Sequence, residues 1–157
     1  RRHPLKRALR VSKLLLAALE ATLRLYLRPE RLTQDLPTLR LLTRALADIE
    51  ATATSVQPEL QAALGPLWCV EPVALQGQIG SGSLPIERLP SAGLAIAPVQ
   101  GKGNGRALDQ LAEALRHLPM PVIGRIADDR LLLDMRCLED ASLFLDQIGH
   151  LTLASKR

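Results

Sequence analysis

The sequence predicts a mixed α/β fold of the α+β type, in which two leading helices precede a mainly antiparallel sheet of about four strands with helices on one face. Leucines recur at helical spacing through residues 5–28 and again from 37 to 53, as in amphipathic helices. After Gly65-Pro66 the pattern changes to short apolar runs, which are typical of strands. Two of these runs flank the turn pair Asp128-Asp129, so we expect neighbouring strands to be antiparallel.

The two leading helices are the clearest elements of the pattern. The first is expected over residues 5–28 and is stopped by Pro29. Ser12 takes the place of a leucine on its apolar face. The second is expected to begin near Pro37 and to fade before Pro58.

The later elements are shorter. Residues 68–75 are expected to form a strand, and Pro72 within it favours an edge strand or a bulge. The others, in chain order, are a loop at 77–83, a buried strand at 94–97, a loop at 100–105, a helix at 108–115, strands at 122–126 and 131–135, and a helix at 138–148.

This order of elements predicts three parts along the chain. Leading helices occupy residues 1–64, a small α+β domain occupies 65–150, and a frayed tail follows at 151–157. The sequence begins with charged residues that already belong to the helical pattern, and it has no initiator methionine. We therefore expect the chain to be a piece of a longer polypeptide.

Composition narrows the function classes. Apolar residues make up 47% of the 157 residues, enough for a folded core. Aromatic residues make up only 2%, which argues against single-stranded nucleic-acid binding by base stacking. The net charge of +4 fits a phosphate-bearing partner such as RNA. The longest apolar run, residues 14–19, is too short to cross a membrane.

The chain shows no arrangement of residues typical of a catalytic or metal site. Cys69 and Cys137 form no CxxC pair and are expected to be free, buried thiols of a cytoplasmic protein. The three histidines are scattered, so we expect no metal site. No Ser-His-Asp or Cys-His set and no lysine in an apolar pocket can be argued, and we assign no catalytic residue within the chain.

The basic start of the chain is the strongest candidate for a binding site. Arg7 and Arg10 are three residues apart, so on a helix they would project from one face about one turn apart. Two guanidinium groups placed in this way can bind one phosphate-like anion, and the positive end of the helix dipole would add to the attraction. The alternative is a solvated basic helix end without a ligand.

Two further features are weaker candidates. The segment Gly77–Ser83 resembles a phosphate-binding loop, but it lacks the Gly-Lys-Ser/Thr ending of a Walker motif and is more typical of an ordinary loop between strands; the alternative is a wall of an active site. Arg125 lies within an apolar run, where an arginine is usually paired with a carboxylate, and Asp134 across the hairpin is the candidate partner. The functional alternative for Arg125 is an anion-binding residue that faces a cleft.

Several long segments resemble one family in sequence, order and spacing. The chain is similar, to about Ile148, to the C-terminal part of bacterial selenocysteine synthase, the L-seryl-tRNA(Sec) selenium transferases. The segments that carry the resemblance are His3–Arg10, Leu16–Tyr26, Leu36–Arg40, Gln78–Pro85, Leu89–Ser91, Pro121–Ile126 and Leu133–Leu138.

The resemblance implies a fold and an activity. The fold is the C-terminal small domain of a pyridoxal-phosphate enzyme of the aspartate-aminotransferase type. The activity is conversion of seryl-tRNA(Sec) to selenocysteinyl-tRNA(Sec) with selenophosphate as the selenium donor, by a homo-oligomer. The Schiff-base lysine of the family lies upstream of the matching segments, so we expect the isolated chain to be inactive and leave its cofactor-binding residues unknown.

The resemblance also assigns residues. Arg7 and Arg10 match the family's arginine pair for the phosphate-like selenium donor. Arg125 and the loop residues Gly80, Ser81, Gly82 and Ser83 match the family sequence and are carried over only as lining of the pocket. The alternative function is a basic RNA-binding module, or an oligomerisation module in which the leading helices bury their leucines against a partner.

Overall fold

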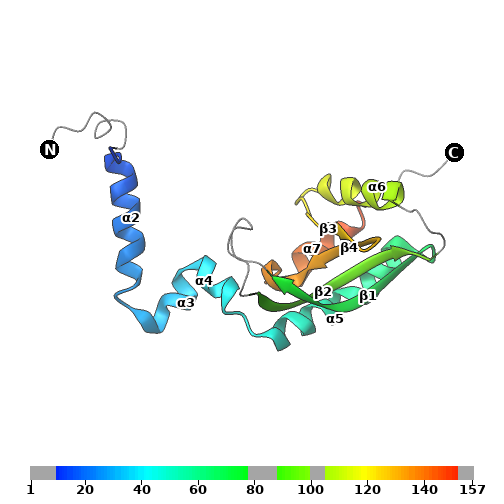
Figure 1. Ribbon diagram of the computed structural model, residues 1–157, viewed down its shortest axis with the longest axis horizontal. Coiled ribbons are helices and arrows are strands. Elements are labelled where there is room, and N and C mark those ends of the chain that lie inside the picture. Colours follow the sequence, from blue (N-terminus) through cyan, green and yellow to red (C-terminus); the bar gives the residue numbers. More distant parts are fainter. Residues whose placement is uncertain (1–9, 78–87, 100–104, 152–157) are drawn as a thin grey trace. The chain divides into compact units, whose positions relative to one another are not determined.

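The leading unit of the computed structural model is helical (Figure 1). The structure describes residues 10–77, 88–99 and 105–151. The chain divides into two compact units between Thr43 and Arg44. The helices of the first are α2 (Lys13–Leu25), the 3-10 helix η1 (Pro29–Arg31), α3 (Leu32–Asp35) and α4 (Pro37–Leu42).

Ser12 is the N-cap of α2, not a residue of its apolar face. Its backbone is extended, and its Oγ accepts a hydrogen bond from the Leu15 N–H at 3.1 Å. A serine hydroxyl satisfies one of the unpaired N–H groups at a helix start, so the helix begins directly after Ser12. The expectation of a helix that runs through Ser12 is therefore wrong, and residues 1–9 lie outside the described part of the chain.

The second predicted helix is two helices in the structure. α4 ends at Leu42, and α5 (Leu46–Leu64) runs through Pro58, so the expected end before this proline is also wrong. Proline in a helix interior costs about 3 kcal/mol. The buried stripe of α5 continues beyond Pro58 and offsets that cost; it consists of Ile49, Ala53, Val56, Leu60 and Leu64.

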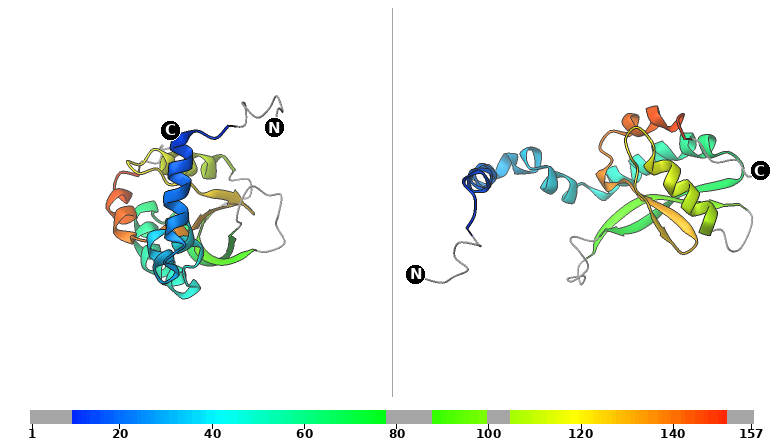
Figure 2. Two further views of the ribbon diagram at one scale, coloured as in Figure 1. Left: turned by 90° about the vertical axis from the view of Figure 1, so that its left-hand side faces the viewer. Right: turned by 90° about the horizontal axis from the view of Figure 1, so that it is seen from above.

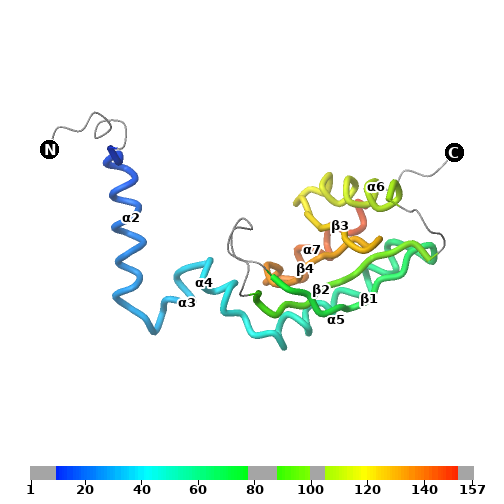
Figure 3. Tube along the Cα trace, viewed as in Figure 1, coloured from blue at the N-terminus to red at the C-terminus, as the bar shows by residue number. Residues whose placement is uncertain are grey.

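The second unit contains a four-stranded antiparallel sheet in the order β1-β2-β4-β3. This confirms the predicted mixed α/β fold with a mainly antiparallel sheet. The tube in Figure 3 shows β1 and β2 as a long pair of neighbouring strands. After α5 the elements are β1 (Trp68–Gly77), β2 (Leu89–Pro98), α6 (Gly105–Arg116), β3 (Arg125–Ala127), β4 (Arg130–Asp134), the 3-10 helix η2 (Met135–Cys137) and α7 (Ala141–Ile148).

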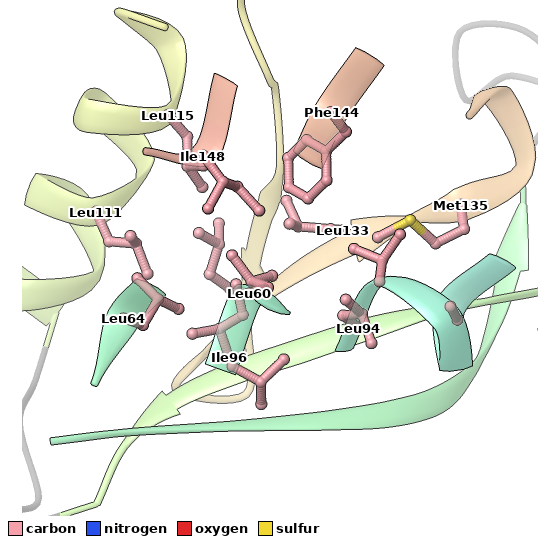
Figure 4. Close-up of a cluster of buried hydrophobic side chains, with 14 of the residues drawn as sticks. Leu60, Leu64, Leu94, Ile96, Leu111, Leu115, Leu133, Met135, Phe144 and Ile148 are labelled. Atoms are coloured by element: carbon pink, nitrogen blue, oxygen red, sulfur yellow. The ribbon is translucent and has the colours of Figure 1, made fainter. Parts of the chain in front are cut away.

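The core lies between one face of the sheet and the three helices of this unit (Figures 2 and 4). Leu94 and Ile96 of β2 and Leu133 of β4 point from the sheet into this core, where Leu60 of α5 and Leu115 of α6 meet them. Helices on one face were predicted. The sequence analysis grouped α5 with the leading helices, whereas here it packs on β1 and β2. The division of a full-length protein at residue 64 stays a prediction.

The other face of the sheet, called the open face below, carries its own small apolar cluster. Leu75, Ala95 and Leu132 are buried there. Gly93 lies between them on β2, and a Cβ atom at this position would come within 2.0 Å of the Leu133 carbonyl oxygen and 2.7 Å of Leu75 Cδ1. Only glycine therefore allows β2 and β4 to approach as closely as they do.

The β3–β4 hairpin is tighter than predicted. Strand β3 begins at Arg125, so the segment 122–124 is not strand. The Val122 N–H instead donates to the Leu115 carbonyl at the end of α6. Asp128 and Asp129 form the expected turn, with φ angles of 50° and 56°. Two successive residues of positive φ are typical of a type I′ hairpin.

The free edge of β1 is capped by two glutamines of α5. Gln61 Oε1 accepts from the Val70 N–H at 2.9 Å, and Gln57 Nε2 donates to the Val70 carbonyl at 3.0 Å. Edge strands with unpaired backbone groups invite pairing with other chains. These side chains occupy such groups near the start of β1, and Pro72 lies two residues further along this edge strand, as predicted.

Arg44 joins the start of α5 to the segment that follows β4 through hydrogen bonds. Its Nη1 lies 3.0, 3.1 and 2.7 Å from the carbonyl oxygens of Met135, Arg136 and Leu138, and its Nη2 donates to Thr52 Oγ1 at 2.6 Å. One side chain thus holds η2, which follows β4 directly, beside the first turn of α5. This contact fixes the end of β4 where the candidate site lies.

Candidate anion-binding site

The structure describes two of the seven residues that the sequence singled out. Arg10 is exposed and lies before the N-cap of α2, so it is not on the described helix as expected. Arg125 is exposed at the start of β3. Arg7 and the loop residues Gly80, Ser81, Gly82 and Ser83 lie outside the described residues. The anion-binding role of the Arg7 and Arg10 pair stays a prediction.

Arg125 borders a cavity of about 320 Å³ at the polar end of the open face. Arg88, which directly precedes β2, also borders it, and β4 lies between β2 and the strand β3 that carries Arg125. Their guanidinium groups give the cavity two positive charges. The remaining lining comes from Leu75, Gln76, Gly77, Leu132 and Asp134.

Asp134 is held in place within this lining. Its Oδ1 accepts from Ser91 Oγ at 2.7 Å and from the Arg136 backbone N–H at 2.9 Å. Ser91 is 2% exposed, and Arg136 is buried with its Nη2 donating to the Pro90 carbonyl. A buried polar side chain needs such partners, because an unsatisfied one destabilises the fold. The carboxylate is therefore a fixed feature of the cavity.

The predicted pairing of Arg125 with Asp134 is not found. Within the described part of the chain the ion pairs are Arg24 with Glu20 and Arg31 with Asp35, both in the leading unit. Strand register places Arg125 opposite Leu132. An exposed guanidinium needs no carboxylate to offset burial, and Asp134 already has two donors. Arg125 thus keeps its charge available for a ligand.

The cavity can bind an anion through charge-assisted hydrogen bonds. Arginine presents a planar set of donors that matches phosphate and carboxylate groups. The fixed Asp134 opposes a purely anionic ligand and favours one that also carries a hydroxyl or amino donor. The Ser91 hydroxyl beside Asp134 is buried at 2% exposure and out of reach of a ligand, so binding is the chemistry that these residues support.

Both cysteines are free, as predicted. Partial burial raises the pKa of the Cys69 thiol, and the nearby Glu71 carboxylate, 3.5 Å from Sγ, raises it further by hydrogen bonding and by its charge. A thiol with a raised pKa is a poor nucleophile at neutral pH. Cys137 is exposed, which corrects the expectation that it is buried.

Other surfaces of the described residues carry few features of a ligand site. No group of three or more His, Cys, Asp or Glu side chains there could hold a metal ion. No helix in that part is long and apolar enough to span a membrane. An apolar pocket of about 500 Å³ lies between α7 and residues 120–123 and is bordered by Glu139 and Asp140.

Sequence analysis missed Arg88, Ser91, Arg136 and Arg44. Ser91 and Asp134 are 43 residues apart, and Arg44 and Met135 are 91 apart, so no local spacing links them. Strand register brings Ser91 and Asp134 together. An alternation of polar and apolar residues along the segment 89–95 would have pointed to Ser91, but most of the residues around it are apolar and no alternation is visible.

Comparison with known proteins identifies the family. The family model for L-seryl-tRNA selenium transferase (SelA) matches residues 1–139. The chain belongs to the L-seryl-tRNA selenium transferase family. It is 56% identical over 146 residues to the L-seryl-tRNA(Sec) selenium transferases of Salmonella paratyphi B, Salmonella heidelberg and Salmonella dublin. The match covers 93% of this chain but only 31% of each relative, so the chain corresponds to a portion of an L-seryl-tRNA selenium transferase.

Proposed function

We propose that this chain is the C-terminal portion of a cytoplasmic, homo-oligomeric, pyridoxal-phosphate-dependent transferase. The full enzyme converts seryl-tRNA(Sec) to selenocysteinyl-tRNA(Sec) with selenophosphate as the selenium donor. The observation that carries the proposal is the 56% identity over 93% of the chain to relatives named for this reaction. Segment-by-segment similarity at this level supports a shared role rather than a shared fold alone.

The described residues do not form a site for pyridoxal phosphate. A Schiff-base lysine works in a desolvated pocket, where its pKa is lowered. Lys13 is the only lysine among the described residues, and it is exposed on α2. We therefore propose that the cofactor is bound by a lysine outside this chain. On this proposal the isolated chain is inactive.

The chain's own contribution is anion binding. Arg7 and Arg10 bind the selenophosphate, and Arg125 lines the pocket together with Gly80, Ser81, Gly82 and Ser83. Support comes from the position of Arg125, which borders the open-face cavity, as Asp134 and Arg88 do. Exposed guanidinium groups without a carboxylate partner are suited to phosphate-like ligands.

The test compares a full-length transferase that carries this chain with the isolated chain. Each is given pyridoxal phosphate, selenophosphate and seryl-tRNA(Sec), and selenocysteinyl-tRNA(Sec) is measured. We expect turnover from the full-length protein and none from the isolated chain. No turnover by a folded, cofactor-loaded full-length protein would contradict the proposed reaction, and turnover by the isolated chain would contradict the placement of the cofactor.

A second candidate function is a basic RNA-binding module. The observation that favours it is the net charge of +4, with Arg88 and Arg125 exposed at one cavity. Such a module would bind tRNA by itself with a steep dependence on salt. Titration of the isolated chain with tRNA at low and at high salt measures this directly, and no binding at low salt would exclude it.

A further inference from the structure

Helix α2 exposes almost all of its apolar side chains. None of its residues is buried. Leu14 is 84% exposed, Leu23 is 56% exposed, and Leu27, just beyond the helix, is 79% exposed. Single exposed leucines are common on protein surfaces, but a run of them on one helix marks a surface that another structure covers.

The apolar residues surround most of the helix. At about 100° per residue, Leu16, Leu19 and Leu23 fall on one side. The opposite side carries Leu14, Ala18, Ala21 and Leu25, and Leu15 and Tyr26 lie between the two. Together they cover roughly 220° of the circumference, an arc in which Thr22 is the one polar residue, and its hydroxyl donates to the Ala18 carbonyl. The polar residues Lys13, Glu20 and Arg24 share one narrow strip, where Arg24 and Glu20 form an exposed ion pair at 2.8 Å.

This distribution limits the kind of partner. A helix that lies on a surface, or pairs with one other helix, has an apolar stripe of about 100° or somewhat more. A helix that is apolar nearly all round is an interior helix of a larger protein. A second copy of α2 could cover one side of the helix but would leave the opposite side in water. The partner must therefore contact α2 on at least two sides.

We infer that α2 is an interior helix of the full-length transferase, packed on both apolar sides by the part of the polypeptide that this chain does not span. The relatives supply the size of that part, because the chain covers only 31% of their length. The inference rests on the proposal that the chain works as a portion of such an enzyme. The Lys13, Glu20 and Arg24 strip is then the only side of α2 that faces water.

The experiment measures thiol labelling in a full-length transferase whose native cysteines are replaced by serine. Ala18→Cys and Leu23→Cys place thiols on the two apolar sides, and Ala17→Cys is the matched control beside the polar strip. Ala17 and Ala18 are adjacent and of equal size, so their substitution costs the helix equally little. We expect a maleimide to label the first two at least about tenfold more slowly than Ala17→Cys, because labelling there requires local opening.

The isolated chain provides the second arm. There we expect the three thiols to react at similar rates. Equal labelling of Ala17→Cys and either test variant in the folded full-length protein would overturn the inference. Protection of the test thiols in the isolated chain would also overturn the inference. If that protection is lost on dilution, a second copy of the chain covers α2; if it persists, the chain's own second unit covers it. Turnover is recorded separately, so protected thiols in a protein without turnover would refute the proposed function and not this packing.

Discussion

Removal of the Arg44 guanidinium should destabilise the second unit more than removal of any other exposed or half-buried arginine that the structure describes there. In the structure Nη1 lies within hydrogen-bond distance of three carbonyl oxygens, at 3.0, 3.1 and 2.7 Å, and Nη2 donates to Thr52. These carbonyls belong to residues 135–138, which join β4 to α7. The Arg44→Ala variant therefore releases η2 from the start of α5.

The magnitude follows from the donors. Nη1 carries two N–H groups, so it makes two well-directed bonds and shares the third acceptor. Hydrogen bonds to a charged group contribute about 1.5–3 kcal/mol each. Arg44 is half-buried, and water can replace part of what is lost. We expect Arg44→Ala to lower the free energy of unfolding by about 2–4 kcal/mol, and Arg44→Lys, which keeps the charge without the planar fork, by about half as much.

Urea unfolding of the chain, followed by fluorescence, measures this loss. Trp68 is the only tryptophan, and it packs against the core at the start of β1. The control is Arg106→Ala, because Arg106 is exposed on α6 and should change the free energy by less than about 0.5 kcal/mol. If Arg44→Ala unfolds at the same urea concentration as Arg106→Ala, the bonds of Arg44 contribute nothing and the reasoning fails.

Three further changes test the backbone and one titrating group. Gly93→Ala should lower the free energy of unfolding by about 3 kcal/mol or more, because its Cβ would lie 2.0 Å from a carbonyl oxygen of β4. The control is Gly105→Ala, whose Cβ would meet nothing within 4 Å, so it should leave the free energy unchanged in the same urea titration. Asp129→Gly should raise the melting temperature and the free energy of unfolding by about 0.5–1 kcal/mol, since glycine adopts the observed φ of 56° without strain; a decrease would contradict this. Hydrogen bonds from the Ser142 hydroxyl and then from its N–H hold the pKa of Asp140 below the ordinary 3.8. The ionised cap therefore stabilises α7 fully above that pH, and the advantage of wild type over Asp140→Asn in melting temperature should disappear as the pH falls below 3.8; an advantage that persists in acid would contradict it.

The periodic elements of this chain could be predicted from its sequence, and the elements set by distant contacts could not. The leucine spacing gave α6, and the Asp128-Asp129 pair gave the hairpin, because both signals are local. The end of α5 was missed because Pro58 is a strong local breaker, whereas the core that holds the next turns is built from remote strands. A local breaker such as Pro58 does not end a helix when burial of the following residues stabilises it more than the proline destabilises it.

The candidate site shows the same division. Arg125 could be singled out because an arginine within an apolar run is unusual. Pairing with Asp134 was the first expectation and an arginine that faces a cleft was the alternative; the structure shows an exposed Arg125 beside a cavity and no such pair. Arg88 and Ser91 become part of the site only through the register of β1, β2 and β4. Such residues carry no pattern in the sequence itself.

The proposed reaction depends on the arginines at the start of the chain, which are proposed to bind the selenium donor. The most direct measurement is the rate of selenocysteinyl-tRNA(Sec) formation by the full-length transferase against selenophosphate concentration, for Arg7→Ala, Arg10→Ala and the control Arg28→Ala. We predict that the first two raise the KM for selenophosphate at least about tenfold, since each removes charge-assisted bonds to a phosphate-like group. The control should match wild type. An unchanged KM in both Arg7→Ala and Arg10→Ala would contradict the account.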